Sequence, residues 1–519
     1  MGGSAAARSV VLSLTTQVAA DGARSDFPST SSPVRGLCVW MKEVLTMASK
    51  SPKRSLRSPF LAVLLASCAH YKPLLLAPET TATAFMARTL AAPQLQEYLA
   101  SNTGRDFAAW PPAEWDFEML TWVAFYYHPS LDVARAQWQV ARGGIRTAAG
   151  RPNPALGVAL GYNFSPSGVS PWFPGVTIDV PVETADKRGR RIARSRLMAE
   201  AAHQNVFSAA WQVRADLRRA LLDFAAVDRR GRALRDLATL QRQSVELLDQ
   251  RRLAGALSTL DASTARVALA RAEADASDAE RLVATTLSRL AQALGVPLAA
   301  LEGQHFADPF AESLPELSVV ALAAARQQCL QSRPDILAAL AVFEASQAAL
   351  QLEIAKQYPD LHIGSGYQWD QGDNKWNLAI TLDLPILNRN EGPIEEAEGK
   401  RREAATQVVA AQARVIAQLD AAQAERAASA AQIAGLEQVE AALKRQADLF
   451  HQQLEAGGID RLEEQGAKVE LAVGRLTLLV ARTKASQAAA QLEDALRIPF
   501  TNLHSVENPP RAPDQPQNP

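Results

Sequence analysis

Residues 154–164 read Pro-Ala-Leu-Gly-Val-Ala-Leu-Gly-Tyr-Asn-Phe, and after a turn rich in Ser, Pro and Gly, residues 175–182 read Gly-Val-Thr-Ile-Asp-Val-Pro-Val. In both stretches the even-numbered residues are large and apolar, and the odd-numbered residues are mostly small or polar. A period of two is typical of a strand with one apolar and one polar face. Two such runs around a turn predict a β-hairpin over residues 154–183.

The same pattern returns about 200 residues later. Leu361, Ile363 and Tyr367 alternate with small or polar residues, and after the turn at residues 370–374 large apolar residues again occupy every second position up to Ile386. A second hairpin is therefore expected over residues 359–387. The chain between and after the two hairpins is rich in alanine and charged residues, which favours helix.

Four long helices are expected, over residues 187–252, 259–294, 393–454 and 460–496. The first contains no proline and would be on the order of 90 Å long at 1.5 Å per residue. A helix of that length belongs to a coiled coil or a solenoid rather than to a compact globule. Gly255 is expected to end the helix over residues 187–252. Gly457 and Gly458 are expected to end the helix over residues 393–454.

The order of elements indicates an internal duplication. Pro129 and Pro154 are separated by the same interval as Pro334 and Pro359, and each half reads as helix, hairpin, long helix, glycine turn, long helix. The expected division of the chain follows from this order. It is an upstream extension with a signal peptide (1–67), a lead-in (68–114), repeat 1 (115–295), a linker (296–316), repeat 2 (317–497) and a disordered tail (498–519).

Strands of about ten residues with an apolar outer face match the wall of a transmembrane β-barrel. Aromatic residues gather at the turn ends of the hairpins, where an aromatic girdle would lie: Tyr162, Phe164, Trp172, Tyr367, Trp369 and Trp376. A soluble, half-buried sheet packed on helices is the alternative. Four strands cannot close a barrel and open edges are not tolerated in lipid, so several copies would have to complete the sheet. The long helices should then continue the barrel as a tube in the aqueous compartment.

Composition excludes several other classes of protein. The chain has 54 Lys and Arg against 55 Asp and Glu, which gives no support for a nucleic-acid partner. Cys38, Cys68 and Cys329 are too few and too scattered for a disulfide framework or a zinc site. No metalloprotease, phosphate-loop or serine-hydrolase motif is present, so we expect no enzyme and no metal or other cofactor. No apolar run of about 18 residues predicts a transmembrane helix.

The segment before residue 69 has the pattern of a bacterial lipoprotein signal. Basic residues at positions 50–57 precede the short apolar run Phe60–Ala66, and Leu65-Ala66-Ser67-Cys68 closes it. We expect cleavage before Cys68, a covalent lipid on that cysteine, and a true start at Met41 or Met47. Ala69 is compatible with the outer membrane. The alternative is a short apolar core segment with a chance cysteine.

Several short motifs occur in a fixed order: the lipobox at Cys68, helix starts at residues 129–131 and 333–335, strand starts at 153–156 and 358–361, strand ends at 180–182 and 384–386, and Leu253-Ala254-Gly255. In this order they resemble the TolC-like outer membrane efflux proteins over roughly residues 68–497. The lipobox resembles the lipoprotein branch that serves resistance–nodulation–division pumps.

The resemblance implies a mainly α fold with a small transmembrane β part. It implies a homotrimer with a twelve-stranded β-barrel that continues into an α-helical coiled-coil tunnel. The barrel would lie in outer-membrane lipid. A periplasmic adaptor and an inner-membrane transporter would dock at the helical tip. The tip would consist of the turns at residues 253–258 and 454–460.

Family members often close this tip with acidic residues after the second turn. The resemblance assigns that role to Asp460, Glu463 and Glu464, and a ring of such carboxylates in a narrow lumen would select cations. A solvated helix face is the alternative for these residues. The function expected is a passive exit channel of a tripartite efflux system. A type I protein-secretion channel and a periplasmic coiled-coil scaffold or adaptor lipoprotein are the alternatives.

Overall fold

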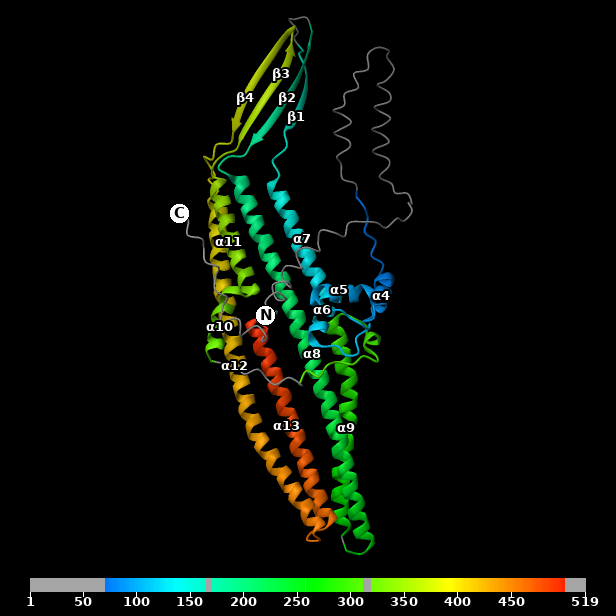
Figure 1. Cartoon of the computed structure of the whole chain (residues 1–519). Helices are drawn as coiled ribbons and strands as arrows, with labels where there is room; N and C mark the ends of the chain where they lie inside the picture. The colour runs from blue at the N-terminus through cyan, green and yellow to red at the C-terminus, as the bar shows by residue number, and fades with distance from the viewer. Residues whose placement is uncertain (1–70, 165–169, 257, 311–318, 500–519) are drawn as a thin grey trace, which may run out of the picture. The chain divides into compact units, whose positions relative to one another are not determined.

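The structure is a computed structural model that describes residues 71–164, 170–256, 258–310 and 319–499 (Figure 1). Cys68 lies outside the described residues. The chain divides into two units, Met1–Arg88 with Ala100–Asp106, and Thr89–Leu99 with Phe107–Pro519. In the first unit, helix α4 (Pro78–Met86) has a proline in its first turn and buries no side chain. The sheet and the long helices all belong to the second unit.

Three shorter helices precede the sheet: α5 (Pro93–Thr103), α6 (Phe117–Tyr127) and α7 (Pro129–Ala149). The side chain of Asp116 caps α6 by accepting a hydrogen bond from the Met119 amide (2.7 Å). Most of α6 is buried, and α6 packs against α8. Pro129 begins α7, where a proline at the first turn is favourable because its missing N–H has no helical partner.

The long helices form two antiparallel pairs. α8 (Lys187–Leu253) packs along α9 (Thr259–Leu294), and α12 (Glu391–Glu455) packs along α13 (Arg461–Leu496) (Figure 1). The 67 residues of α8 correspond to about 100 Å of helix. Small side chains allow close packing between the pairs. Leu234 of α8 and Ala276 and Ala279 of α9 form a buried cluster, and Leu476 of α13 packs against it.

One stretch of the described residues, Ala321–Ala355, is long and apolar enough to cross a membrane by length and composition. Polar residues are scattered through this stretch, so it contains no unbroken apolar run of the kind sought in the sequence, although its average hydropathy is high. It comprises α10 (Val319–Ser332) and α11 (Pro334–Ala355), which are interrupted at Arg333. Arg333 is buried, pairs with Asp335 (2.6 Å) and donates to the Ala495 carbonyl (2.6 Å). These contacts, and the packing of α11 on α8 and α12, are those of a core helix.

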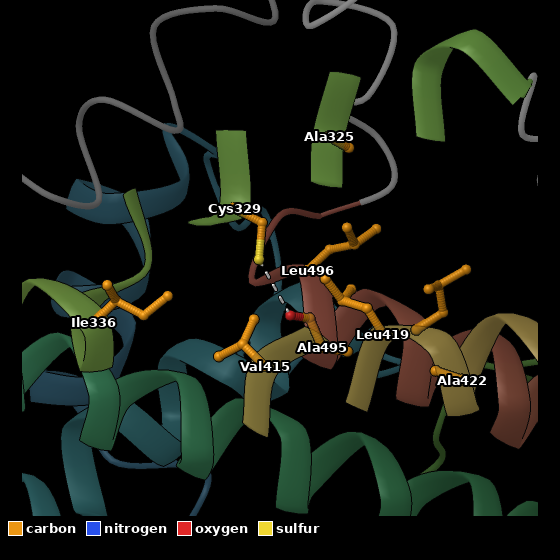
Figure 2. Packing of buried hydrophobic residues seen from close by; sticks show 9 residues of the cluster. Ala325, Cys329, Ile336, Val415, Leu419, Ala422, Ala495 and Leu496 are labelled. Carbon is orange, nitrogen blue, oxygen red and sulfur yellow. Dashed lines mark hydrogen bonds between the residues drawn. The ribbon is translucent and has the colours of Figure 1, made fainter. Parts of the chain in front are cut away.

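A cluster of buried apolar side chains lies where α10 and α11 meet the second helix pair (Figure 2). Leu419 and Leu492 are fully buried in it. Cys329 is also fully buried, and its thiol donates to the Ala495 carbonyl at 3.6 Å, as the dashed line in Figure 2 shows. Cys329 is therefore part of the hydrophobic core. The 3₁₀ helix η2 (Leu298–Leu301) follows α9.

The two hairpins form one antiparallel sheet in the order β1-β2-β3-β4. The strands are β1 (Ala155–Tyr162), β2 (Trp172–Val182), β3 (Leu361–Asp370) and β4 (Asp373–Leu382). The hairpins are joined through β2 and β3, where Val182 lies opposite Leu361. The register places most of the large apolar residues on one face and most of the small or polar residues on the other; Ser365, opposite Ile178, and Phe173, opposite Gly161, are exceptions. A Cβ at Gly366 would overlap the end of the Asn377 side chain, which would have to move to make room for it.

The duplication is visible in the backbone. Leu156 pairs with Ile178 in the first hairpin, and Leu361 pairs with Leu382, their counterparts, in the second. The residues that precede α8 and α12 both adopt left-handed conformations, with φ of 56° at Asp186 and 61° at Asn390. Helices α9 and α13 both contain 36 residues. Equal registers, caps and lengths follow from two copies of one structural unit.

Candidate functional site: the interhelical turns and the two-faced sheet

The turns after α8 and α12 have the same construction. Gly255 and Gly457 both have φ of 74°, a left-handed conformation that glycine adopts without strain. The Ala256 amide donates to the Arg251 carbonyl (2.9 Å), and the Gly458 amide donates to the Gln453 carbonyl (2.8 Å). These bonds satisfy the last helical carbonyls and form Schellman-type ends. Helices α8 and α12 therefore end in the same way.

Asp460 joins the two helix pairs near these turns. Its carboxylate caps α13 by accepting from the amides of Leu462 (2.7 Å) and Glu463 (3.1 Å). It also forms an ion pair with Arg251 in the last turn of α8, and this hydrogen bond holds the pKa of Asp460 below its usual value. The Glu463 side chain in turn accepts from the Asp460 amide, which completes a capping box. Asp460 thus has two roles, in the cap and between the pairs.

Glu464 has a different position from Asp460. Its side chain is almost buried between α12 and α13, where Lys468 Nζ and His451 Nδ1 each lie 2.8 Å from Oε1. The hydrogen bond from Lys468, followed by that from His451, holds its pKa below the usual value. Of the three carboxylates expected at the gate, Asp460 connects the two pairs, Glu463 caps a helix and Glu464 binds within one pair. Their arrangement around a lumen remains a prediction.

Two sets of polar contacts between α8 and α13 were not predicted from the sequence. The buried Gln465 side chain donates to the Leu240 carbonyl (2.9 Å) and to Gln243 Oε1 (3.1 Å). Far from the turns, the buried Glu493 carboxylate accepts from Arg214 (2.6 Å) and from Arg218. Glutamine, glutamate and arginine are common on solvated helix faces, so only the position of each residue in the helix-packing pattern could have identified these contacts.

Aromatic residues cluster at the hairpin turns, the ends of the strands that are remote from the helices. The ring of Tyr162 lies 5.2 Å from that of Phe164 and 4.8 Å from that of Trp172, and the rings of Tyr367 and Trp376 are 4.9 Å apart. These values are typical of edge-to-face and tilted aromatic pairs. Trp369 is half-buried at the end of β3. The aromatic girdle expected from the sequence remains a prediction, and its residues do gather at one end of the sheet.

The apolar face of the sheet is uncovered. Val158 of β1 and Leu378 of β4 are 76% and 72% exposed. A contiguous apolar surface of this kind marks a membrane or protein interface. In the described part of the chain no group of three or more His, Cys, Asp or Glu side chains is placed to hold a metal ion. The candidate site therefore has two parts: the exposed apolar face of the sheet, and the polar side chains near the ends of α8 and α12.

Comparison with known proteins supports the family resemblance. The sequence profile of the family described as "Outer membrane efflux protein" matches two segments of this chain, residues 125–296 and 325–496. The curated protein "Cobalt-zinc-cadmium resistance protein CzcC" of Cupriavidus metallidurans is 26% identical over 274 residues. That match covers 52% of this chain and 62% of CzcC, so the chain spans less than two thirds of this relative.

Two solved structures share the fold. The outer membrane protein VceC of Vibrio cholerae is 19% identical with a TM-score of 0.61, over 74% of this chain and 96% of VceC. The CmeC outer membrane channel of Campylobacter jejuni is 14% identical with a TM-score of 0.59, over 73% of this chain and 85% of CmeC. The expected fold class, a mainly helical chain with two repeats and a small β part, is confirmed. With both repeats matched by one profile, the chain belongs to the outer membrane efflux protein family.

Proposed function

We propose that the chain is the outer-membrane exit channel of a tripartite efflux system and passes small solutes out of the cell without catalysis. The observation that carries this proposal is the four-stranded sheet, whose apolar face is exposed and whose strands continue directly into long helices. Strand β2 ends at Val182 and α8 begins at Lys187, so the sheet and the helical part form one path. An apolar wall followed by a helical tube suits a channel that crosses one membrane.

The channel is proposed to be a homotrimer, in which three four-stranded sheets form a twelve-stranded barrel. Exposed apolar side chains on α12 and α9 support contacts with further chains. On α12, Leu449 and Phe450 line a hollow of about 370 Å³, and on α9, Leu260 and Val267 are 72% and 51% exposed. Neighbouring copies and a periplasmic adaptor are the proposed occupants, with an inner-membrane transporter of the resistance–nodulation–division type as the energy source. A lipid on Cys68 would anchor the chain to the outer membrane.

The proposed gate is the contact between the two helix pairs at the turns. Arg251 with Asp460, and Gln465 with the Leu240 carbonyl, hold α8 against α13. Opening would separate these contacts, and an adaptor that binds the open state better would shift the equilibrium toward it. The name of the relative CzcC and the carboxylates at the turns make divalent metal cations a substrate class to test.

The two alternatives make different predictions. A type I protein-secretion channel would share the barrel and the gate and differ in its cargo. A soluble periplasmic scaffold would leave the apolar sheet face in water, which is unfavourable for a contiguous apolar surface.

A charge placed on either face of β4 tests the proposal. Ile380 lies on the apolar face and its neighbour Thr381 on the polar face. In a barrel wall, Ile380→Arg costs roughly 2–4 kcal/mol in lipid and Thr381→Arg projects into water. We expect Ile380→Arg to abolish trimer in the outer-membrane fraction and Thr381→Arg to retain it. Equal amounts of both variants in a soluble periplasmic fraction would refute the channel.

A further inference from the structure

The apolar face of the sheet has a small polar side chain at its centre, Ser365 of β3. Strand β3 lies between β2 and β4 (Figure 1). Ser365 lies opposite Ile178 of β2 on one side and opposite Leu378 of β4 on the other. The eight positions that surround it on this face all carry large apolar or aromatic side chains. They are Val176, Ile178, Val180, Ile363, Tyr367, Trp376, Leu378 and Ile380.

The small side chain leaves a hollow in this surface. Its volume is about 300 Å³, and it is lined by Val176, Ile178, Ser365, Gly366, Tyr367 and Trp376. The rings of Tyr367 and Trp376, whose centroids are 4.9 Å apart, form its wall on the side of the hairpin turn. The Tyr367 hydroxyl donates to Asn374 Oδ1 (2.6 Å), which fixes the position of that ring. The hollow therefore has an aromatic wall toward the turn and aliphatic side chains along β2.

The duplication shows that a larger residue fits at this position. Adding 205 to positions in β1 and 204 to positions in β2 converts the pair Leu160–Pro174 into the pair Ser365–Leu378. Repeat 1 therefore has a leucine where repeat 2 has Ser365. The hollow results from the residue at this position and not from the pairing of the strands.

In the channel proposed above, the hollow faces lipid just below the membrane interface. Tyrosine and tryptophan rings of a membrane protein lie at the level of the lipid headgroups. Ser365 is two residues from Tyr367 in the direction of the helices, which is about 6.6 Å along the strand and about 5 Å in depth for a strand tilted by about 40°. The interfacial zone of one leaflet is about 5–7 Å thick. Ser365 therefore lies at the depth where esters join acyl chains to the headgroup.

The Ser365 hydroxyl needs a hydrogen-bond acceptor at that depth. Its oxygen has no hydrogen-bond partner in the part of the chain that the structure describes. A hydroxyl placed in hydrocarbon without a partner is unfavourable. The ester carbonyl oxygen of a lipid is an acceptor that lies at this depth, next to an apolar chain that matches the rest of the hollow.

We propose that the hollow around Ser365 binds the first part of an ester-linked acyl chain of a membrane lipid. The Ser365 hydroxyl donates a hydrogen bond to the ester carbonyl oxygen, and Val176, Ile178 and Trp376 contact the chain. The occupant is a lipid and not a second copy, because copies that complete a barrel meet at the edge strands and leave the outer face to lipid. This proposal rests on the channel proposed above and adds a lipid-binding site on its outer wall.

Two synthetic lipids with the same headgroup and the same chains test the hydrogen bond. They are a diester phosphatidylglycerol and its diether analogue, which lacks the ester carbonyls. The purified, detergent-extracted full chain is delipidated and titrated with each lipid. Native mass spectra then report the number of copies, the number of lipids bound and the dissociation constant of each lipid.

Four variants separate the hydroxyl from the hollow. Ser365→Ala keeps the hollow and removes the hydroxyl, Ser365→Thr keeps a hydroxyl, and Ser365→Leu fills the hollow with the residue of repeat 1. Thr381→Ala is the matched control, because it removes a hydroxyl from the polar face of the neighbouring strand.

We expect one tightly bound lipid per copy in the parent chain, with the diester bound about three- to tenfold more tightly than the diether. Ser365→Ala should remove this preference, and Ser365→Thr and Thr381→Ala should retain it. Ser365→Leu should weaken the binding of both lipids at least tenfold, because no space remains for the chain.

The outcomes distinguish the site from the channel. A detergent-dependent trimer that binds neither lipid, binds both equally, or keeps its affinity in Ser365→Leu would overturn the lipid site and leave the channel standing. A parent chain that stays soluble and monomeric without detergent and binds neither lipid would overturn the channel and the site together.

Discussion

Removing the ion pair between Arg251 and Asp460 should open the channel. Arg251→Met keeps the length of the side chain and removes its charge. Asp460→Asn removes the charge from the other partner, and asparagine remains a good helix cap, so the start of α13 is preserved. Both variants break the contact between α8 and α13 at the turns and leave the rest of the tip unchanged.

The size of the effect follows from the exposure of the pair. The side chains of Arg251 and Asp460 are 36% and 45% exposed, so solvent screens their attraction. Exposed ion pairs contribute about 0.2–1 kcal/mol each. Three copies in a trimer would then contribute roughly 0.6–3 kcal/mol to the closed state, which corresponds to an increase of about 3- to 140-fold in the ratio of open to closed channels.

Planar-bilayer recordings measure that ratio as open probability. The increase should be largest at low ionic strength, because salt screens exposed charges. The double variant Arg251→Met/Asp460→Asn should open no more than either single variant, since both remove the same interaction. Single variants with the open probability of the parent chain at every salt concentration would refute the role of this pair.

Three further predictions concern the helices and their turns. Glu493→Ala leaves Arg214 and Arg218 without their shared carboxylate and should lower the free energy of unfolding by about 3 kcal/mol, measured by thermal unfolding in detergent. The control Asp228→Ala, at an exposed position, should cost less than about 0.5 kcal/mol. Equal losses in the two variants would contradict the estimate for Glu493. Gly457→Ala must adopt a left-handed conformation and should cost roughly 1 kcal/mol, whereas Gly458→Ala, at a position without positive φ, should be nearly neutral in the same assay. Because Lys468 and His451 depress the pKa of Glu464, its stabilising contribution is present above its unfolded value of about 4.3 and is lost as the pH falls through the folded pKa. Thermal stability in detergent should therefore fall in acid below that range in the parent chain, and Glu464→Gln should reduce this fall.

The local pattern of the sequence was sufficient for the repeated elements. Alternation at residues 154–182 predicted the hairpin, and the register later placed its residues on the two expected faces. Gly255 and Gly457 predicted turns, and both adopt the left-handed conformation that glycine adopts without strain. These features depend on neighbours in sequence, so a linear pattern contains them.

The tertiary contacts of the polar residues were not predictable in the same way. Asp460, Glu463 and Glu464 lie within five positions of one another, yet their partners lie on three different segments. Glu493 has the composition of a solvated helix face and is 2% exposed, because α8 brings two arginines to it from almost 280 positions earlier. Only the packing of α8 against α13 decides which charges meet. The high average hydropathy of Ala321–Ala355 likewise does not decide whether this stretch is a membrane span or a core segment. The contact of the buried Arg333 with α13 indicates a core segment.

The most direct test of the central claim is the conductance of the purified, detergent-extracted chain in a planar lipid bilayer, recorded together with its native mass. The account predicts a trimer that forms discrete, cation-selective channels, with open probability raised by Arg251→Met. A water-soluble monomer or dimer that gives no conductance, with or without that substitution, would contradict the channel and favour the periplasmic scaffold.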